Sequence, residues 1–162
     1  MTKYDCKIIY SANFKKILDF YLFDCLVPEV SQRGCSLEKY NWTNTAKLER
    51  KMKKLSHISE NNWKVVKKSD DFANYTNLLT SETKCCLFTN NKGRNVLSIL
   101  YGIRNSFAHG SFDIKTINNR KVYFLDACKE KKAKIDRKAR IVLYEKTLLD
   151  WIKLIKDGDT DK

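Results

Sequence analysis

The feature that most constrains the fold of this chain is its shortage of chain-breaking residues. Among the 162 residues, Pro28 is the single proline, and only five residues are glycines. A β-sandwich of many short strands would need more of both at its turns, so the composition favours helices. A hydrophobic content of 43% is typical of a packed globule. We therefore predict a mainly α-helical fold in a single domain that covers residues 1–162.

Apolar residues recur at spacings of three and four in several segments, and this period indicates amphipathic helices. The expected helical segments cover 8–26, 36–55, 61–81, 93–109 and 144–156. The clearest is the helix over about 93–109, whose apolar stripe consists of Val96, Ile99, Leu100, Ile103 and Phe107. Gly110 follows this helix directly, in a position where glycine often ends a helix.

The hydrophobic period changes to two after this helix. Residues 112–117 and 121–125 alternate between apolar and polar, and Asn118-Asn119 between them tolerates positive φ angles. We predict a β-hairpin over about 112–127. The basic segment 129–140 is either a flexible loop or the start of a third strand over 139–143. The expected β structure is therefore a small hairpin or a three-stranded insertion before the C-terminal helix.

The net charge of +13 favours a polyanionic partner, because unneutralised like charges repel one another. Nucleic acid is the first candidate, an anionic membrane surface is the second, and general lysine richness is the alternative without a partner. One basic cluster consists of Lys51, Lys53 and Lys54. A second supplies candidate contacts to an RNA backbone: Lys131, Lys132, Lys134, Arg137, Lys138 and Arg140. Either cluster is also compatible with a simple solvated face.

The six cysteines show no Cys-x-x-Cys spacing and no cluster with histidine, so we expect no metal site and no other cofactor. The neighbours Cys85 and Cys86 are poorly placed for a disulfide. No signal-peptide pattern is visible, and no stretch approaches the roughly 18 apolar residues needed to span a bilayer. We therefore expect a cytoplasmic protein with reduced thiols and no membrane association.

Three candidate catalytic residues, Arg104, Asn105 and His109, lie at the end of the clearest helix. Asn105 and His109 are four residues apart, so they share a helix face and Asn105 is expected to orient the imidazole. Arg104 and His109 are five apart, which separates them by about 140° around the helix axis. They converge only if the helix ends at His109 or if a second copy of the helix packs alongside.

These residue types suit metal-free cleavage of RNA by its own 2′-hydroxyl. Arginine binds a phosphate through two parallel hydrogen bonds, and histidine titrates near neutral pH and can transfer protons. The structural alternatives are an Arg104–carboxylate pair and a His109 that binds helix carbonyls. Tyr101 and Ser106 are further RNA-binding candidates, although core packing and a backbone hydrogen bond are their ordinary roles. His57 is more plausibly a surface or capping residue.

The run Arg-Asn-Ser-Phe-Ala-His-Gly resembles the signature of the HEPN superfamily, in which arginine precedes histidine by four to six residues and asparagine often follows the arginine. Arg104, Asn105 and His109 match this pattern. The tail, with 138–141 leading into 148–152, is similar to a plasmid- and defence-associated branch. The resemblance covers roughly residues 95–157.

This resemblance implies a helical bundle that dimerises through the motif helices and forms one composite site. It also implies a metal-independent endoribonuclease that leaves 2′,3′-cyclic phosphate and 5′-hydroxyl ends, acting as a toxin or in abortive phage defence. An antitoxin or a defence-system protein is a possible partner, but Ser111 stands where a modifiable tyrosine is often found. The alternatives are a non-catalytic RNA-binding or protein-interaction module and, third, a membrane-surface or purely structural helical protein.

Overall fold

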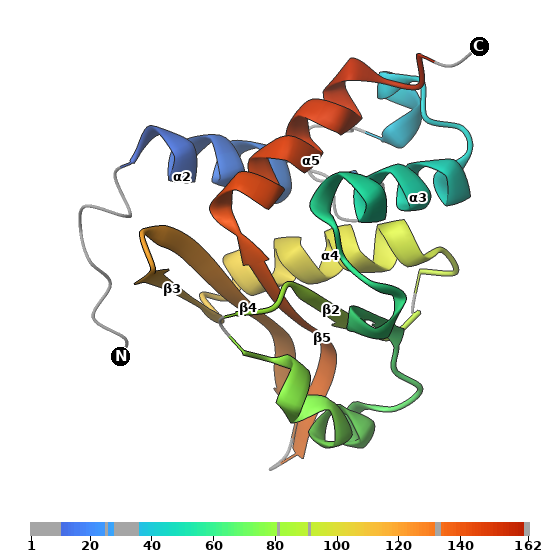
Figure 1. Cartoon of the computed structure of the whole chain (residues 1–162). Helices are drawn as coiled ribbons and strands as arrows, with labels where there is room; N and C mark the ends of the chain where they lie inside the picture. The colour runs from blue at the N-terminus through green and yellow to red at the C-terminus, as the bar shows by residue number, and fades with distance from the viewer. Residues whose placement is uncertain are drawn as a thin grey trace.

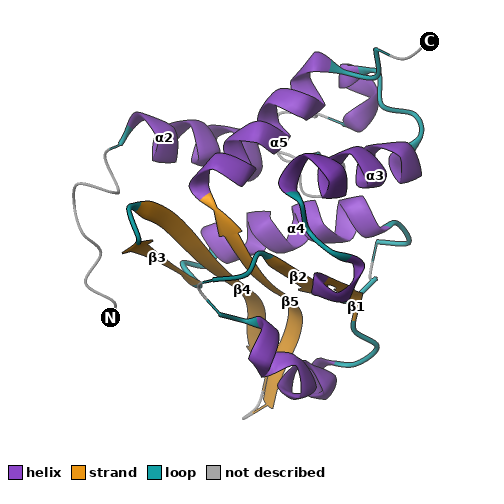
Figure 2. Cartoon of the chain, viewed as in Figure 1, coloured by secondary structure: helices purple, strands orange, loops and turns teal. Residues whose placement is uncertain are grey.

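The computed structural model describes residues 11–24, 26–27, 36–80, 82–90, 92–131 and 134–160. These residues form a five-stranded mixed sheet with most of the helices packed on one face (Figures 1 and 2). The prediction of a mainly α-helical bundle is therefore wrong, and the fold is α/β. The sheet is the structural frame of the molecule and not a small insertion before the C-terminal helix.

Among the described residues, five helical elements come before the first strand, and three strands follow one another before the C-terminal helix. The helical elements are α2 (Ala12–Leu18), the π-helical η1 (Asp19–Asp24), η3 (Leu37–Tyr40), α3 (Thr45–Ser56), η4 (Glu60–Asn62), η5 (Ser69–Leu78), α4 (Asn95–Ala108) and α5 (Glu145–Asp157). The strands are β1 (Trp63–Val65), β2 (Cys85–Phe88), β3 (Phe112–Ile117), β4 (Arg120–Lys131) and β5 (Lys134–Tyr144). Their order in the sheet is β1-β2-β5-β4-β3, with β1 and β2 parallel and every other pair antiparallel.

Two segments differ most from the sequence predictions. The expected helices over 61–81 are replaced by β1 and by η5, a 3-10 segment that is kinked at Tyr75. The described part of the basic stretch contributes the end of β4 and the beginning of β5, so the third strand expected over 139–143 is present and starts earlier, at Lys134. β5 pairs with β2 on one side and with β4 on the other. The expected turn at Asn118-Asn119 is confirmed, and both residues have positive φ, 49° and 59°.

Two hydrophobic clusters lie on opposite faces of the sheet. The larger cluster joins α2, α3, α4 and α5 to the inner face, where Trp151 of α5 packs against Trp63 of β1. Trp42 donates a hydrogen bond from Nε1 to the carbonyl of Ile155 at 3.0 Å, which satisfies its buried nitrogen. The smaller cluster lies under η5 and consists of Val66, Phe72, Cys85 and Leu87.

Helix α4 lies unusually close to β5. Gly102 is buried, and a Cβ atom at this position would be 2.7 Å from the Cβ of Ala139. A glycine is therefore needed for the observed approach of the two backbones. This contact places the C-terminal end of α4 beside the end of β4 and the beginning of β5.

Two expectations concern the membrane and the thiols. Within the part of the chain that the structure describes, no helix is both long and apolar enough to cross a membrane. Cys85, Cys86 and Cys128 are free thiols. Cys6, Cys25 and Cys35 lie outside the described residues.

Candidate functional site

A small cavity of about 180 Å³ lies between the C-terminal half of α4 and the β4–β5 hairpin. One wall is a single face of α4, where Tyr101, Asn105 and His109 follow one another at four-residue spacing. The opposite wall comes from the hairpin: Ala127, Cys128, Lys129, Asp136 and Lys138. We call this space the α4 cavity. The structure thus brings Asn105 and His109 together, as the sequence predicts.

The end of α4 exposes His109 at the cavity. His109 is the C-cap residue that follows α4, and Gly110 adopts a φ of 64° directly after it. The N–H of Gly110 donates to the carbonyl of Phe107 at 3.2 Å, and the N–H of Ser111 donates to the carbonyl of Ser106 at 2.9 Å. This pair of bonds closes the helix in a Schellman motif, so the predicted role of Gly110 is confirmed.

Arg104 is tied to its neighbour and not to His109. Its Nη1 donates to Oδ1 of Asn105 at 3.0 Å, and Arg104 does not line the α4 cavity. Its Nε is buried and has no hydrogen-bond partner within the described ranges. Over the same residues, no hydrogen bond joins the Asn105 side chain to the imidazole. The expected hydrogen bond from Asn105 to His109 is therefore not formed in the structure, where the amide oxygen of Asn105 accepts from Arg104.

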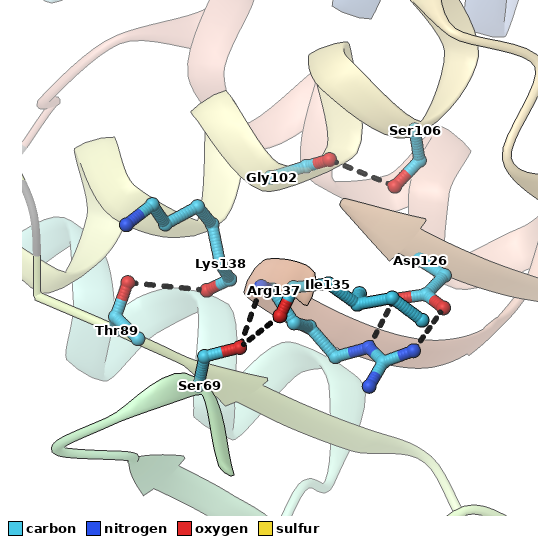
Figure 3. Close-up of polar contacts among 8 residues, drawn as sticks. All are labelled: Ser69, Thr89, Gly102, Ser106, Asp126, Ile135, Arg137 and Lys138. Carbon is cyan, nitrogen blue, oxygen red and sulfur yellow. Dashed lines mark hydrogen bonds and ion pairs between the residues drawn. The ribbon is translucent and has the colours of Figure 1, made fainter. Parts of the chain in front are cut away.

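A β-bulge in the hairpin brings Lys138 into the α4 cavity. Ala127 pairs with Ala139, but the next residue, Cys128, pairs with Arg137, so Lys138 is left over in β5. Figure 3 shows the side chains of Lys138 and Arg137 leaving β5 in different directions. Lys138 rises toward α4, whereas Arg137 runs along the strands to Asp126.

The charges around the α4 cavity are mostly positive. Lys129 is exposed, and Nζ of Lys138 lies 3.1 Å from Oδ1 of Asp136. Nζ of Lys92 lies 4.4 Å from the ring centroid of Tyr101, a cation–π contact at the edge of the cavity. Burial, followed by the nearby Asp126 carboxylate, raises the pKa of the Cys128 thiol, so this residue is a poor nucleophile at neutral pH.

The remaining RNA-binding candidates do not gather at the cavity. Ser106 is 1% exposed and donates to the carbonyl of Gly102 at 2.9 Å, so it is a structural residue and that prediction is wrong. Arg137 forms a bidentate pair with Asp126 at 2.7 and 3.0 Å. Arg140 is half-buried and faces away from α4, because the flanking Ala139 and Ile141 belong to the inner core.

Three further lysines belong to this basic segment. Lys134 pairs with Asp70 at 3.5 Å, on the outer part of the hairpin. Lys131 belongs to β4, but only its backbone is described, and Lys132 lies outside the described residues. Among the described basic side chains of this segment, Lys129 and Lys138 are the ones that line the α4 cavity.

The basic cluster on α3 is also partly neutralised. Lys53 forms ion pairs with Glu49 and Glu60 at 3.2 and 3.0 Å. His57 is exposed and caps α3 in the left-handed conformation, with a φ of 53°, in agreement with a capping role. None of these residues lines the α4 cavity.

Sequence reasoning missed Lys129, Asp136 and Lys92 as residues of the site. Lys129 and Asp136 occupy paired positions on β4 and β5, which only the hairpin register reveals. No group of three or more histidine, cysteine, aspartate or glutamate side chains in the described segments is arranged to hold a metal ion.

A comparison with models of protein families, with curated proteins and with solved structures finds no match for this chain. The resemblance to the HEPN superfamily consequently rests on the residues of the motif and of the tail alone.

Proposed function

We propose that this chain is a metal-independent endoribonuclease that holds one phosphate of an RNA strand in the α4 cavity. The observation that carries the proposal is the convergence of His109 with two lysines, Lys129 and Lys138, around one small cavity. A toxin or phage-defence role, a regulatory protein partner and a cytoplasmic location are parts of the same proposal, motivated by the HEPN resemblance.

The size of the cavity favours a polymer over a small metabolite. Sites that enclose a whole small molecule usually measure about 300–1,000 Å³, whereas the α4 cavity measures about 180 Å³. It has room for one phosphate with part of a nucleotide. The net charge of +13 would attract the rest of the strand along the surface.

The proposed reaction needs groups that the cavity offers. The 2′-hydroxyl attacks the adjacent phosphorus, the bond to the 5′ oxygen breaks, and a 2′,3′-cyclic phosphate and a 5′-hydroxyl result. One group must accept the 2′ proton and one must protonate the leaving oxygen. His109 takes one of these roles, and the lysines stabilise the charge that develops on the phosphate.

The ammonium of Lys129 can protonate the leaving oxygen. Arg104, whose guanidinium stays protonated, can contribute only as a further cation, and we expect this contribution from another copy of the chain. The side of α4 that remains partly open carries Leu97, Tyr101, Arg104 and Ala108. A homodimer through this stripe would bring Arg104 of one chain toward His109 of the other. In that case, mixing Arg104→Gln protein with His109→Asn protein should restore cleavage, because each mixed dimer contains one complete site.

The central test compares the two histidines of the chain. His109→Asn should abolish metal-free cleavage of single-stranded RNA in EDTA and leave the fold intact. His57→Asn is the matched control, because asparagine tolerates the positive φ at the end of α3. Equal cleavage by both variants would refute the assignment. Binding of RNA without cleavage by the wild type would identify a binding module instead.

A further inference from the structure

We propose that Lys138 is the phosphate-binding cation of this site, and that the carboxylate of Asp136 occupies it until RNA binds. The inference deepens the proposed function and rests on it. It assigns the phosphate-binding role to a lysine of the same chain as His109, in place of Arg104.

The bulge is the first argument. In an unbroken strand, side chains alternate, so Lys138 would point away from α4 like Arg140. The extra residue in β5 changes the alternation between Ala139 and Arg137 and places Lys138 on the cavity wall. Bulges are frequent beside active sites, where they redirect one side chain. Here the redirected side chain is a cation that faces His109 across a small cavity.

The backbone around Lys138 is held on both sides of the bulge (Figure 3). Its carbonyl accepts hydrogen bonds from the N–H of Thr89 at 2.8 Å and from Oγ1 of Thr89 at 3.4 Å. The N–H of the preceding Arg137 donates to Oγ of Ser69 at 2.7 Å, and its guanidinium is fixed on Asp126. A rigid support of this kind lowers the cost of ordering a binding side chain.

Arg104 is a weaker candidate within one chain. Its guanidinium is hydrogen-bonded to Asn105, and it does not contribute to the cavity wall. Lys138 already lies on that wall, at 40% side-chain exposure, so a phosphate can reach it without a rearrangement of α4.

Asp136 provides the second argument, because it places an anion on Lys138 where a phosphate would bind. Its Oδ1 lies 3.1 Å from Nζ of Lys138, and both side chains line the cavity. An incoming phosphate must displace this carboxylate from Lys138. Removal of the negative charge at residue 136 should therefore strengthen phosphate binding, and only when Lys138 is present.

The experiment uses four variants of the full chain: Lys138→Gln, Asp136→Asn, the double variant and Lys134→Gln. Lys134 lies on the same strand, is 73% exposed and does not line the cavity, so it is the matched control. The first readout is the NMR response of the His109 ring to inorganic phosphate, which needs no cleavage. The second is kcat and KM on a short single-stranded RNA.

We expect the His109 signals to respond to phosphate in the wild type and in Lys134→Gln, and the response to disappear in Lys138→Gln. Cleavage efficiency should fall about tenfold to hundredfold in Lys138→Gln, as for loss of a hydrogen bond to a charged group. Asp136→Asn should bind phosphate about two- to fivefold more tightly, as for loss of one exposed ion pair. The double variant should show no such gain.

The outcomes separate this inference from the proposed function. A wild type that binds phosphate through Lys138 but cuts no RNA supports the inference and refutes the nuclease. A Lys138→Gln variant that responds to phosphate like the wild type overturns the inference, whatever the cleavage result. If Lys138→Gln fails to fold, the gain in Asp136→Asn decides the question, and its absence overturns the inference.

Discussion

The close approach of α4 to β5 at Gly102 predicts a specific effect of Gly102→Ala. The new methyl carbon would lie 2.7 Å from the Cβ of Ala139, whereas carbon atoms make their best contacts at roughly 3.5–4.0 Å. Both atoms are bonded directly to the backbone, so neither can rotate away. The two elements must therefore move apart by roughly 1 Å at this point.

The expected energy is the difference between two effects. Overpacking of a core costs about 1–3 kcal/mol, and a contact between two backbones belongs in the upper half of that range. Replacing glycine by alanine within a helix stabilises by up to about 1 kcal/mol. We therefore expect the free energy of unfolding to fall by about 1–2 kcal/mol in Gly102→Ala.

A double-variant cycle in urea denaturation tests this reasoning. Ala139→Gly removes the opposing methyl group, so the combination with Gly102→Ala moves one methyl across the contact and restores the packing. The two substitutions should show a coupling free energy of at least about 1 kcal/mol. A Gly102→Ala variant as stable as the wild type, with effects that simply add in the double variant, would refute the proposed contact.

Three further substitutions test the buried thiol of Cys85 and two basic residues of the hairpin, Arg137 and Lys129. Burial raises the pKa of Cys85 to about 12, above its value in the unfolded chain. The free energy of unfolding should therefore fall as the pH rises from about 9 toward 12. Cys85→Ala should make that fall shallower in urea titrations. Arg137→Met should lower the free energy of unfolding by about 1 kcal/mol with little change in RNA affinity, because Asp126 already holds the guanidinium. Lys129→Gln should leave stability within about 0.5 kcal/mol and weaken RNA binding, with a salt slope reduced by about one. A loss of RNA affinity in Arg137→Met together with unchanged RNA binding in Lys129→Gln would contradict these expectations. So would an alkaline fall in stability that Cys85→Ala leaves unchanged.

Local signals in the sequence predict the elements that depend on nearby residues. The apolar stripe predicts a helix over 93–109 and the structure has α4 over Asn95–Ala108, ended by Gly110 with a positive φ. The pair Asn118-Asn119 predicts the turn between β3 and β4. In each case, the residues that determine the conformation lie within the segment itself or directly beside it.

The sheet depends on contacts between distant parts of the chain, and for this reason it escapes local patterns. All four residues of β2 are buried, because the inner core covers one face and the cluster under η5 covers the other. Such a strand shows no alternation. Its partner in β5 is far away in sequence, with Cys85 paired to Val142. A scarcity of glycine and proline argues against a sheet only when many tight turns join its strands. This sheet needs few such turns.

The site was partly predictable for the same physical reason. Asn105 and His109 share a face because of helix geometry alone, whereas Lys138 reaches the cavity through a bulge in a hairpin that no periodicity reveals. The sequence motif therefore identifies one wall of the cavity, and the other wall follows only from the pairing of β4 with β5.

The motif segment serves the core and the cavity at once, and this determines how loss of activity should be interpreted. Ser106 and Phe107 are buried, while His109, within the next three residues, is exposed at the C-cap of the helix. A substitution that shifts α4, such as Gly102→Ala, should reduce stability and activity together, because both walls of the cavity depend on one helix–strand contact. A substitution of a group that touches RNA should reduce activity alone. Loss of cleavage at unchanged unfolding free energy is therefore the evidence that would place His109 in the reaction itself.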